Sequence, residues 1–223
     1  MRSRILPTLA FSIVVLGTLV SSQAPGVTDG IKVGKVYVSG ENPVIRLLEK
    51  ESAPPQTQVS FWRIIYSPAG TGHVCFVTSD ISGNGKSPDD VRAAFTDSEP
   101  LLDYLTKEIL GTFDKTYVED PFPRVKATFA RGTGDTRKEW KESLTSEKYK
   151  VELVWKDFYA PFQLDTPVGG ARNPFGVTSL FIPAKNAEVS INGKRVVGRP
   201  FPQMRGPAQS SSAFLAFSET WIK

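Results

Sequence analysis

The chain has 223 residues, of which 40% are hydrophobic, 11% aromatic and 22% charged, and this composition is typical of an ordered globular protein rather than a disordered or fibrous one. The formal net charge of +4 is too small to indicate a nucleic-acid-binding protein. The single cysteine, Cys75, excludes an internal disulfide.

The N-terminal segment has the pattern of a secretory signal peptide. Met1-Arg-Ser-Arg4 is basic, residues 5–20 are mostly apolar, and Ser21-Ser22 supplies small residues for a peptidase. The apolar run is shorter than the ~20 residues that span a bilayer. We therefore expect cleavage after Ser22, no stable membrane span afterwards, and a secreted or periplasmic protein in which residues 23–223 form one β-rich domain.

The first half of this domain contains four segments with strand character. They cover residues 31–39, 43–49, 59–66 and 73–78. In the third, Val59 and Phe61 alternate with Trp62 and Ile64, so both faces are apolar. This pattern predicts a central strand that is covered on both sides.

Two short helices are predicted at about residues 87–111. The first begins at Ser87, because Pro88 and two aspartates follow this N-cap. The second begins at Ser98 and ends at Gly111, and its leucines and Ile109 form one apolar stripe. The stripe indicates packing against the core.

Residues 124–158 predict a meander of three antiparallel strands, at 124–131, 136–144 and 149–158. Side chains alternate with a period of two, which places Val125, Ala127 and Phe129 on one face. In the third strand Trp155 shares the apolar face and Lys156 the polar one. We therefore expect one buried and one solvated face.

The C-terminal part alternates irregular segments with strands. Residues 160–176 and 198–212 are rich in proline and glycine and predict long loops. Asn192-Gly193 predicts a type I′ hairpin that pairs Ile191 with Lys194 and Val189 with Val196. Strands are expected at 177–182 and 213–222.

Together these elements predict a mainly β fold, an antiparallel sandwich or flattened barrel of about nine or ten strands with a short two-helix insertion. An α+β arrangement, with the helices on one concave sheet face, is the alternative.

Candidate catalytic residues are few. His73 and Cys75 share a strand face about 7 Å apart, which is too far for a nucleophilic pair. Carboxylates flank the meander and are candidates for paired acid and base chemistry; they are Glu119, Asp120, Asp157 and Asp165. No metal site or cofactor is expected, since Asp80 to Gly85 resembles only the start of a calcium loop and Val91 stands where its glutamate is required.

Ligand-binding candidates lie in the two long loops and at the end of the last strand. Gly169-Gly170 beside a guanidinium is suited to an anion, and residues 199–205 combine an aromatic ring with two arginines. The candidates are Arg172, Asn173, Phe201, Arg205 and Trp221.

Three functions remain open on the sequence. The first is an exported, non-catalytic protein that binds a small apolar or aromatic ligand, or a sugar, in a β-lined pocket. The second is a secreted hydrolase or cyclase that depends on carboxylates. The third is a protein-protein interaction module with a solid core.

Overall fold

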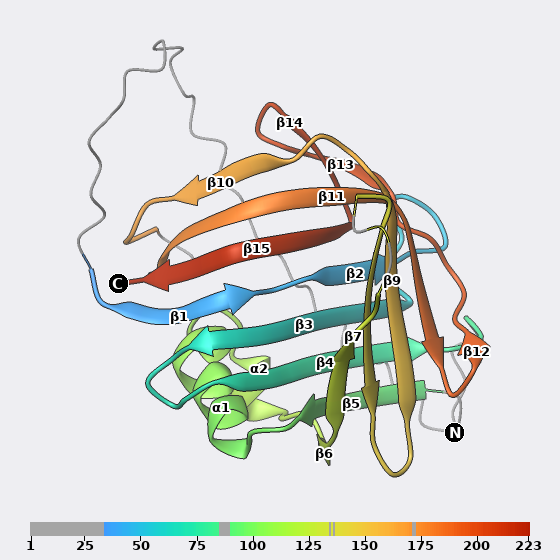
Figure 1. Cartoon of the computed structure of the whole chain (residues 1–223), viewed down its shortest axis with the longest axis horizontal. Helices are drawn as coiled ribbons and strands as arrows, with labels where there is room; N and C mark the ends of the chain where they lie inside the picture. Colours follow the sequence, from blue (N-terminus) through green and yellow to red (C-terminus); the bar gives the residue numbers. More distant parts are fainter. Residues whose placement is uncertain (1–33, 85–89, 134, 136, 171–172) are drawn as a thin grey trace.

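The computed structural model describes residues 34–84, 90–133, 135, 137–170 and 173–223. Strands predominate in them, which confirms the predicted mainly β fold with a short helical insertion (Figure 1). The strands are β1 Val36–Glu41, β2 Val44–Leu47, β3 Thr57–Tyr66, β4 Gly72–Asp80, β5 Asp90–Thr96, β6 Arg124–Lys126, β7 Thr128–Arg131, β8 Glu139–Thr145, β9 Lys150–Phe158, β10 Phe162–Thr166, β11 Gly176–Ile191, β12 Lys194–Arg195, β13 Pro202–Arg205, β14 Ala208–Ser211 and β15 Ala213–Ile222.

One large sheet folds over on itself into two layers. Its main strand order is β6-β5-β4-β3-β1-β15-β11-β9-β8-β7. The 16-residue strand β11 belongs to both layers, because it pairs with β15 up to Pro183 and with β9 from Ala184 onward. In Figure 1, β7, β8 and β9 run across β3 and β4. We call β1–β6, β10, β15 and residues 176–183 the first layer, and β7–β9, β12 and residues 184–191 the second layer.

The two ends of this strand order meet in a single chain segment. Residues 124–131, predicted as one strand, divide at Ala127 into β6, which pairs in parallel with β5, and β7, which pairs antiparallel with β8. The amide of Ala127 donates to the carbonyl of Thr96 at 2.9 Å. The sheet is therefore a flattened barrel that this segment closes.

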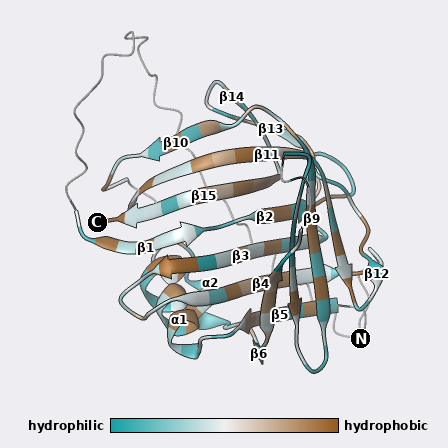
Figure 2. Cartoon of the chain, in the orientation of Figure 1, coloured by the Kyte–Doolittle hydropathy of each residue, from teal (hydrophilic) through white to brown (hydrophobic). Residues whose placement is uncertain are grey.

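The inner core lies between the two layers. Alternation along the strands directs apolar side chains inward from both, as the brown and teal bands of β9 in Figure 2 illustrate. Phe61, Cys75 and Phe95 of the first layer share one buried cluster with Leu153 and Trp155 of the second. The prediction that residues 124–158 bury one face is confirmed.

A helical segment covers the outer face of the first layer. It comprises α1 Glu99–Tyr104, the π-helix η1 Leu105–Ile109, the 3-10 helix η2 Leu110–Thr112 and α2 Thr116–Glu119. The predicted apolar stripe packs with Trp62 and Phe76 in a second cluster, so β3 is covered on both sides as expected. None of the helices in the described ranges is long and apolar enough to cross a lipid bilayer.

The helix predicted to begin at Ser87 is replaced by a strand. Residues 87–89 lie outside the described residues, and Asp90–Thr96 forms β5. Val91, Ala93 and Phe95 point into the inner core, and pairing with β4 satisfies the backbone. Alternation with a period of two outweighs the local N-cap signal here.

The C-terminal hairpin is confirmed and the two loops are more regular than predicted. Asn192 and Gly193 have φ angles of 53° and 78°, and Ile191 pairs with Lys194. Residues 160–176 include β10, and residues 198–212 contain the separate hairpin β13–β14. A turn at Gly206-Pro207 lets this second segment pair with itself.

Candidate functional site

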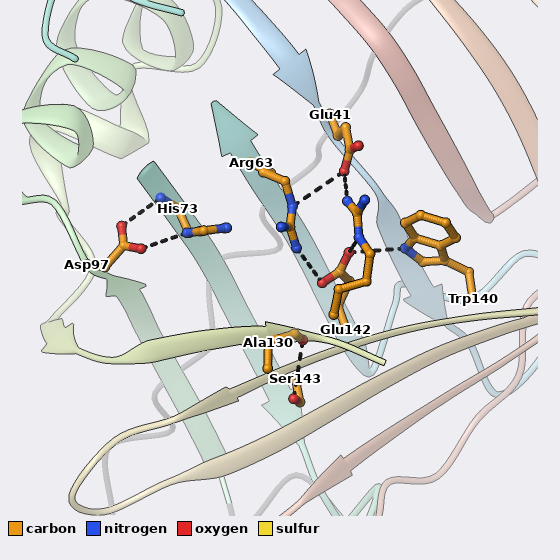
Figure 3. Close-up of polar contacts among 9 residues, drawn as sticks. Glu41, Arg63, His73, Asp97, Ala130, Trp140, Glu142 and Ser143 are labelled. Carbon is orange, nitrogen blue, oxygen red and sulfur yellow. Dashed lines mark hydrogen bonds and ion pairs between the residues drawn. The ribbon is translucent and has the colours of Figure 1, made fainter. Parts of the chain in front are cut away.

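The lining of the inner core changes from apolar to charged at one end of the barrel. Residues two apart share a strand face. Arg63 therefore points inward like Phe61 on β3, and His73 points inward like Cys75 on β4. Figure 3 shows charged side chains from several strands that converge at this end. We call this group the mouth cluster: Glu41, Arg63, His73, Asp97, Phe129, Arg131, Trp140 and Glu142.

Glu142 is the buried centre of the mouth cluster, and its side chain is 0% exposed. Its Oε2 accepts a 2.7 Å hydrogen bond from Nη2 of Arg63, and its Oε1 accepts 3.1 Å hydrogen bonds from Nε of Arg131 and Nε1 of Trp140. Burial raises the pKa of the Glu142 carboxyl, and the two arginines act against that shift. Both carboxylate oxygens are thus fixed in place.

A second carboxylate, Glu41, completes the charge balance. It lies opposite Arg63 in the β1–β3 register, forms a 3.5 Å ion pair with Nε of Arg63, and also pairs with Nη2 of Arg131. The side chains of Arg63, Arg131 and Glu41 are 24%, 36% and 22% exposed. Two arginines and two glutamates therefore form a neutral network whose outer part faces solvent.

His73 and Asp97 form a separate pair beside this network (Figure 3). Oδ2 of Asp97 lies 2.6 Å from Nδ1 of His73, and Oδ1 accepts the His73 backbone amide at 2.7 Å. The imidazole stacks on Phe129 at a centroid distance of 4.8 Å. Its Nε2 atom is buried and has no hydrogen-bond partner among the described residues. Asp97 thus orients the ring and leaves one polar nitrogen unsatisfied.

Aromatic rings border the charged groups on two sides. The guanidinium of Arg131 lies 4.4 Å from the ring centroid of Trp140, and Trp140 packs against Phe217 at 4.8 Å. Phe129 contacts Phe61 edge-on at 5.8 Å. The mouth cluster therefore combines flat apolar surfaces with planar hydrogen-bonding groups.

Of the predicted catalytic residues, only His73 belongs to the mouth cluster. Glu119 is exposed at the end of α2, and Asp120 forms a 3.1 Å ion pair with Arg92. Asp157 on β9 accepts a 2.7 Å hydrogen bond from Asn186, and Asp165 on β10 accepts one of 3.2 Å from Thr178. The adjacent Glu119 and Asp120 thus lie at the end of α2, whereas Asp157 and Asp165 lie on β9 and β10.

The predicted ligand-binding residues divide into three groups. Arg172 lies outside the described residues, and Asn173 shapes its own turn by accepting the Phe175 amide at 3.0 Å. Phe201, expected to be an exposed aromatic, is only 9% exposed. Arg205 and Trp221 do converge: Trp221 donates to Glu219 at 2.8 Å, and Arg205 interacts electrostatically with the same carboxyl.

Sequence reasoning missed most of the mouth cluster, although a signal was present. Glu142 lies between Trp140 and Leu144 on the apolar face of its strand, and Arg131 continues the apolar face of Phe129. A charged residue in an apolar register, near the end of a strand, indicates either a buried ion pair or a site at the rim of a barrel.

Metal ligation is not supported by the described side chains. No group of three or more histidine, cysteine, aspartate or glutamate residues in this part of the chain is arranged to hold a metal ion. In the calcium-like loop, Oδ1 of Asp80 accepts the amides of Gly83 and Asn84 at 2.8 and 3.2 Å, so it caps its own turn.

No protein-family model matches this chain, and no curated protein matches its sequence.

Proposed function

We propose that this is an exported, non-catalytic binding protein that holds a small neutral ligand rich in hydroxyl groups, such as a sugar, at the mouth cluster. The observation that carries the proposal is the neutral network of Glu41, Arg63, Arg131 and Glu142 beside the rings of Phe129 and Trp140. The signal-peptide pattern of residues 1–22 supports export.

The charge balance favours a neutral ligand. Each arginine of the network already contacts two carboxylates, so an anion would have to displace Glu41 or Glu142. A fully apolar ligand would desolvate the exposed parts of these charged groups without replacing their hydrogen bonds to water, which is unfavourable. A hydroxyl group both donates and accepts, so it can satisfy guanidinium and carboxylate groups together.

The geometry of the polar groups also suits hydroxyls. Guanidinium, carboxylate and imidazole groups are planar and present hydrogen-bonding atoms in fixed directions. Nε2 of His73, which has no partner among the described residues, is an acceptor while Asp97 holds the proton on Nδ1. Trp140 and Phe129 supply flat surfaces against which the apolar face of a sugar ring can pack.

Calorimetric titration with a panel of neutral mono- and disaccharides tests the proposal. We expect saturable binding that weakens about tenfold or more in Arg131→Gln, because a charged hydrogen-bond donor is lost. Lys150→Gln is the matched control, since Lys150 pairs only at the surface of β9 with Glu152 in an exposed 3.1 Å contact. If no saccharide binds, or if Arg131→Gln binds as well as the wild type, the proposed site is wrong.

Export is tested separately. The protein is expressed in its own host, and the N-terminus of the material recovered outside the cytoplasm is sequenced. We expect it to begin at Gln23, because the small residues at 21–22 precede that bond. Recovery of an intact N-terminus from the cytoplasm alone would contradict export without affecting the binding site.

A secreted hydrolase or cyclase is the second candidate, and the 2.6 Å contact between His73 and Asp97 favours it. A carboxylate that fixes the tautomer of a histidine leaves Nε2 as a general base. The test is turnover of the saccharides that bind. Turnover that disappears in His73→Gln while binding persists would establish this second function, whereas binding without turnover would leave the first.

A further inference from the structure

The outer face of the first layer carries a second polar group, on the opposite side of the sheet from the inner core. Here the rings of Phe181 on β11 and Phe214 on β15 stack at a centroid distance of 4.5 Å. The guanidinium of Arg205 lies above both, at 4.5 Å from Phe181 and 5.0 Å from Phe214. The two rings thus form an aromatic floor beneath a cation that the β13–β14 hairpin supplies.

Two hydrogen-bonding atoms on this hairpin are buried without a partner. Arg205 pairs with Ala208 and Gln203 pairs with Ser210, so all four side chains share one face of the hairpin. Nη1 of Arg205 and Oγ of Ser210 both lie on that face, and both lack a hydrogen-bond partner in the described part of the structure. Buried donors without partners are costly, and here two of them are diagonal neighbours.

The charge of one carboxyl, that of Glu219, acts on the guanidinium of Arg205. Glu219 lies on β15, and its Oε1 accepts hydrogen bonds from Trp221 Nε1 at 2.8 Å and from Asn42 Nδ2 at 3.4 Å. Burial raises the pKa of Glu219 to about 7, against the opposing effects of Trp221, Asn42, Ser179 and Arg205. Glu219 is therefore neutral over part of the physiological range.

Other charged groups also face Arg205. Arg46 on β2 is a second, largely buried guanidinium; burial and the charge of Arg46 lower the pKa of Arg205 to about 10, while Glu219 acts in the opposite direction. Arg205 remains charged at neutral pH. When Glu219 is protonated, it no longer balances the positive charge of Arg205.

We propose that Arg205 and Ser210, above the rings of Phe181 and Phe214, form a binding site for the oxyanion group of a small molecule. This group is a carboxylate, a sulfate or a phosphate. It binds preferentially when Glu219 carries no charge. The guanidinium and hydroxyl donate to the oxyanion, and the aromatic floor contacts the apolar part of the ligand. This proposal is independent of sugar binding at the mouth cluster.

The β13–β14 hairpin provides the route of entry. Its two strands pair with each other and form a sheet separate from the thirteen-stranded one. Phe201 and Ser212 hold its base by reciprocal backbone and side-chain hydrogen bonds of 2.9 Å. The tip at Gly206-Pro207 can therefore lift from the aromatic floor without breaking any strand pairing of the barrel.

Binding is coupled to pH with a defined sign. An ionised Glu219 repels an incoming anion and partly neutralises Arg205, so the anion binds preferentially when Glu219 is protonated. Affinity therefore rises as the pH falls through about 7. Asn42, Ser179 and Trp221 also act on the same carboxyl by hydrogen bonding, and none of these three side chains titrates in this range.

Sulfate is the suitable probe, because its own charge is constant across this pH range. We expect equilibrium dialysis to show saturable sulfate binding that is about tenfold tighter below pH 7 than above it. Arg205→Gln should abolish binding. Arg199→Gln, which changes an exposed arginine stacked on Phe201, should leave it unchanged.

The Glu219→Gln variant provides a second test, which does not depend on whether the Arg205 variant is stable. Its amide keeps the shape of the carboxyl and never ionises, so this variant should bind sulfate tightly at every pH. The proposal is overturned if wild-type protein shows no saturable binding, if Arg205→Gln binds sulfate equally well, or if the wild-type affinity is the same on both sides of pH 7.

Discussion

Arg63 and Glu142 lie on opposite layers of the barrel, and Nη2 of Arg63 donates a 2.7 Å hydrogen bond to Oε2 of Glu142. The two residues are 79 positions apart in the chain. This contact joins β3 to β8 at the end of the inner core, where apolar packing gives way to charge. The same carboxylate also positions Arg131 and Trp140, which both donate to it.

Glu142→Gln should destabilise the protein. The amide nitrogen that replaces one carboxylate oxygen cannot accept a hydrogen bond, so either Arg63, or Arg131 and Trp140, lose their acceptor, at a cost of about 1–3 kcal/mol. Urea unfolding measures the change. Glu152→Gln removes an exposed pair with Lys150 and should change the free energy of unfolding by less than about 0.5 kcal/mol. Equal effects would show that the Glu142 network does not hold the layers together.

The stability of the protein should depend on pH through Glu219. Its pKa is about 7 in the folded state and 4.5 for an unperturbed glutamate, so the folded state binds more protons between these values. The free energy of unfolding contributed by Glu219 is therefore greatest below pH 4.5, falls as the pH rises, and is lost above about 7, a total of about 3 kcal/mol.

The Glu219→Gln variant isolates this effect. Its amide does not titrate, so the difference in unfolding free energy between wild type and variant should change between pH 4.5 and about 7 and be constant on either side. Chemical unfolding at a series of pH values measures it. A constant difference across the whole series would mean that Glu219 titrates normally.

Cys75 should be inert in the folded protein. Cys75 lies on β4 between β3 and β5, its thiol is fully buried, and burial raises its pKa, so neither reagent nor base reaches it. A chromogenic disulfide reagent should react only at the rate of global unfolding, and rapidly in denaturant. Fast labelling without denaturant would show that the inner core opens locally.

Gly193→Ala should destabilise the β11–β12 hairpin by about 1 kcal/mol, since φ at Gly193 is 78° and an alanine there is strained. Gly193→Asn is the matched control, because asparagine tolerates positive φ and should cost less. Thermal unfolding measures both. Equal losses would show that the positive φ angle does not determine which residues this position tolerates.

Periodicity in the sequence identified which face of each strand is buried, but not which strands are neighbours. The alternation of Val125, Ala127 and Phe129 correctly placed them in the core. It did not reveal that β6 and β7 pair with different partners, because that depends on contacts between distant segments. The mouth cluster was missed for the same reason, because Arg63 and Glu142 come into contact only when β3 and β8 face each other in the folded protein.

Local signals failed where tertiary packing opposed them. Ser87 and Pro88 have the chemistry of a helix start, yet the residues that follow enter a sheet because Val91 and Phe95 complete the inner core. Phe201 lies in a proline-rich stretch that resembles a rim loop, yet it is buried. Arg205 and Trp221 were both candidate ligand-binding residues, but Glu219, the carboxyl that interacts with both, was not among the candidates.

The closing segment at residues 124–131 also limits self-association. A free sheet edge is a template on which another chain can add a strand. In this barrel the terminal strands β6 and β7 are three and four residues long, and they carry Arg124, Lys126 and Arg131. Such short, cationic edges offer little to an incoming strand, so strand addition is disfavoured where the barrel closes.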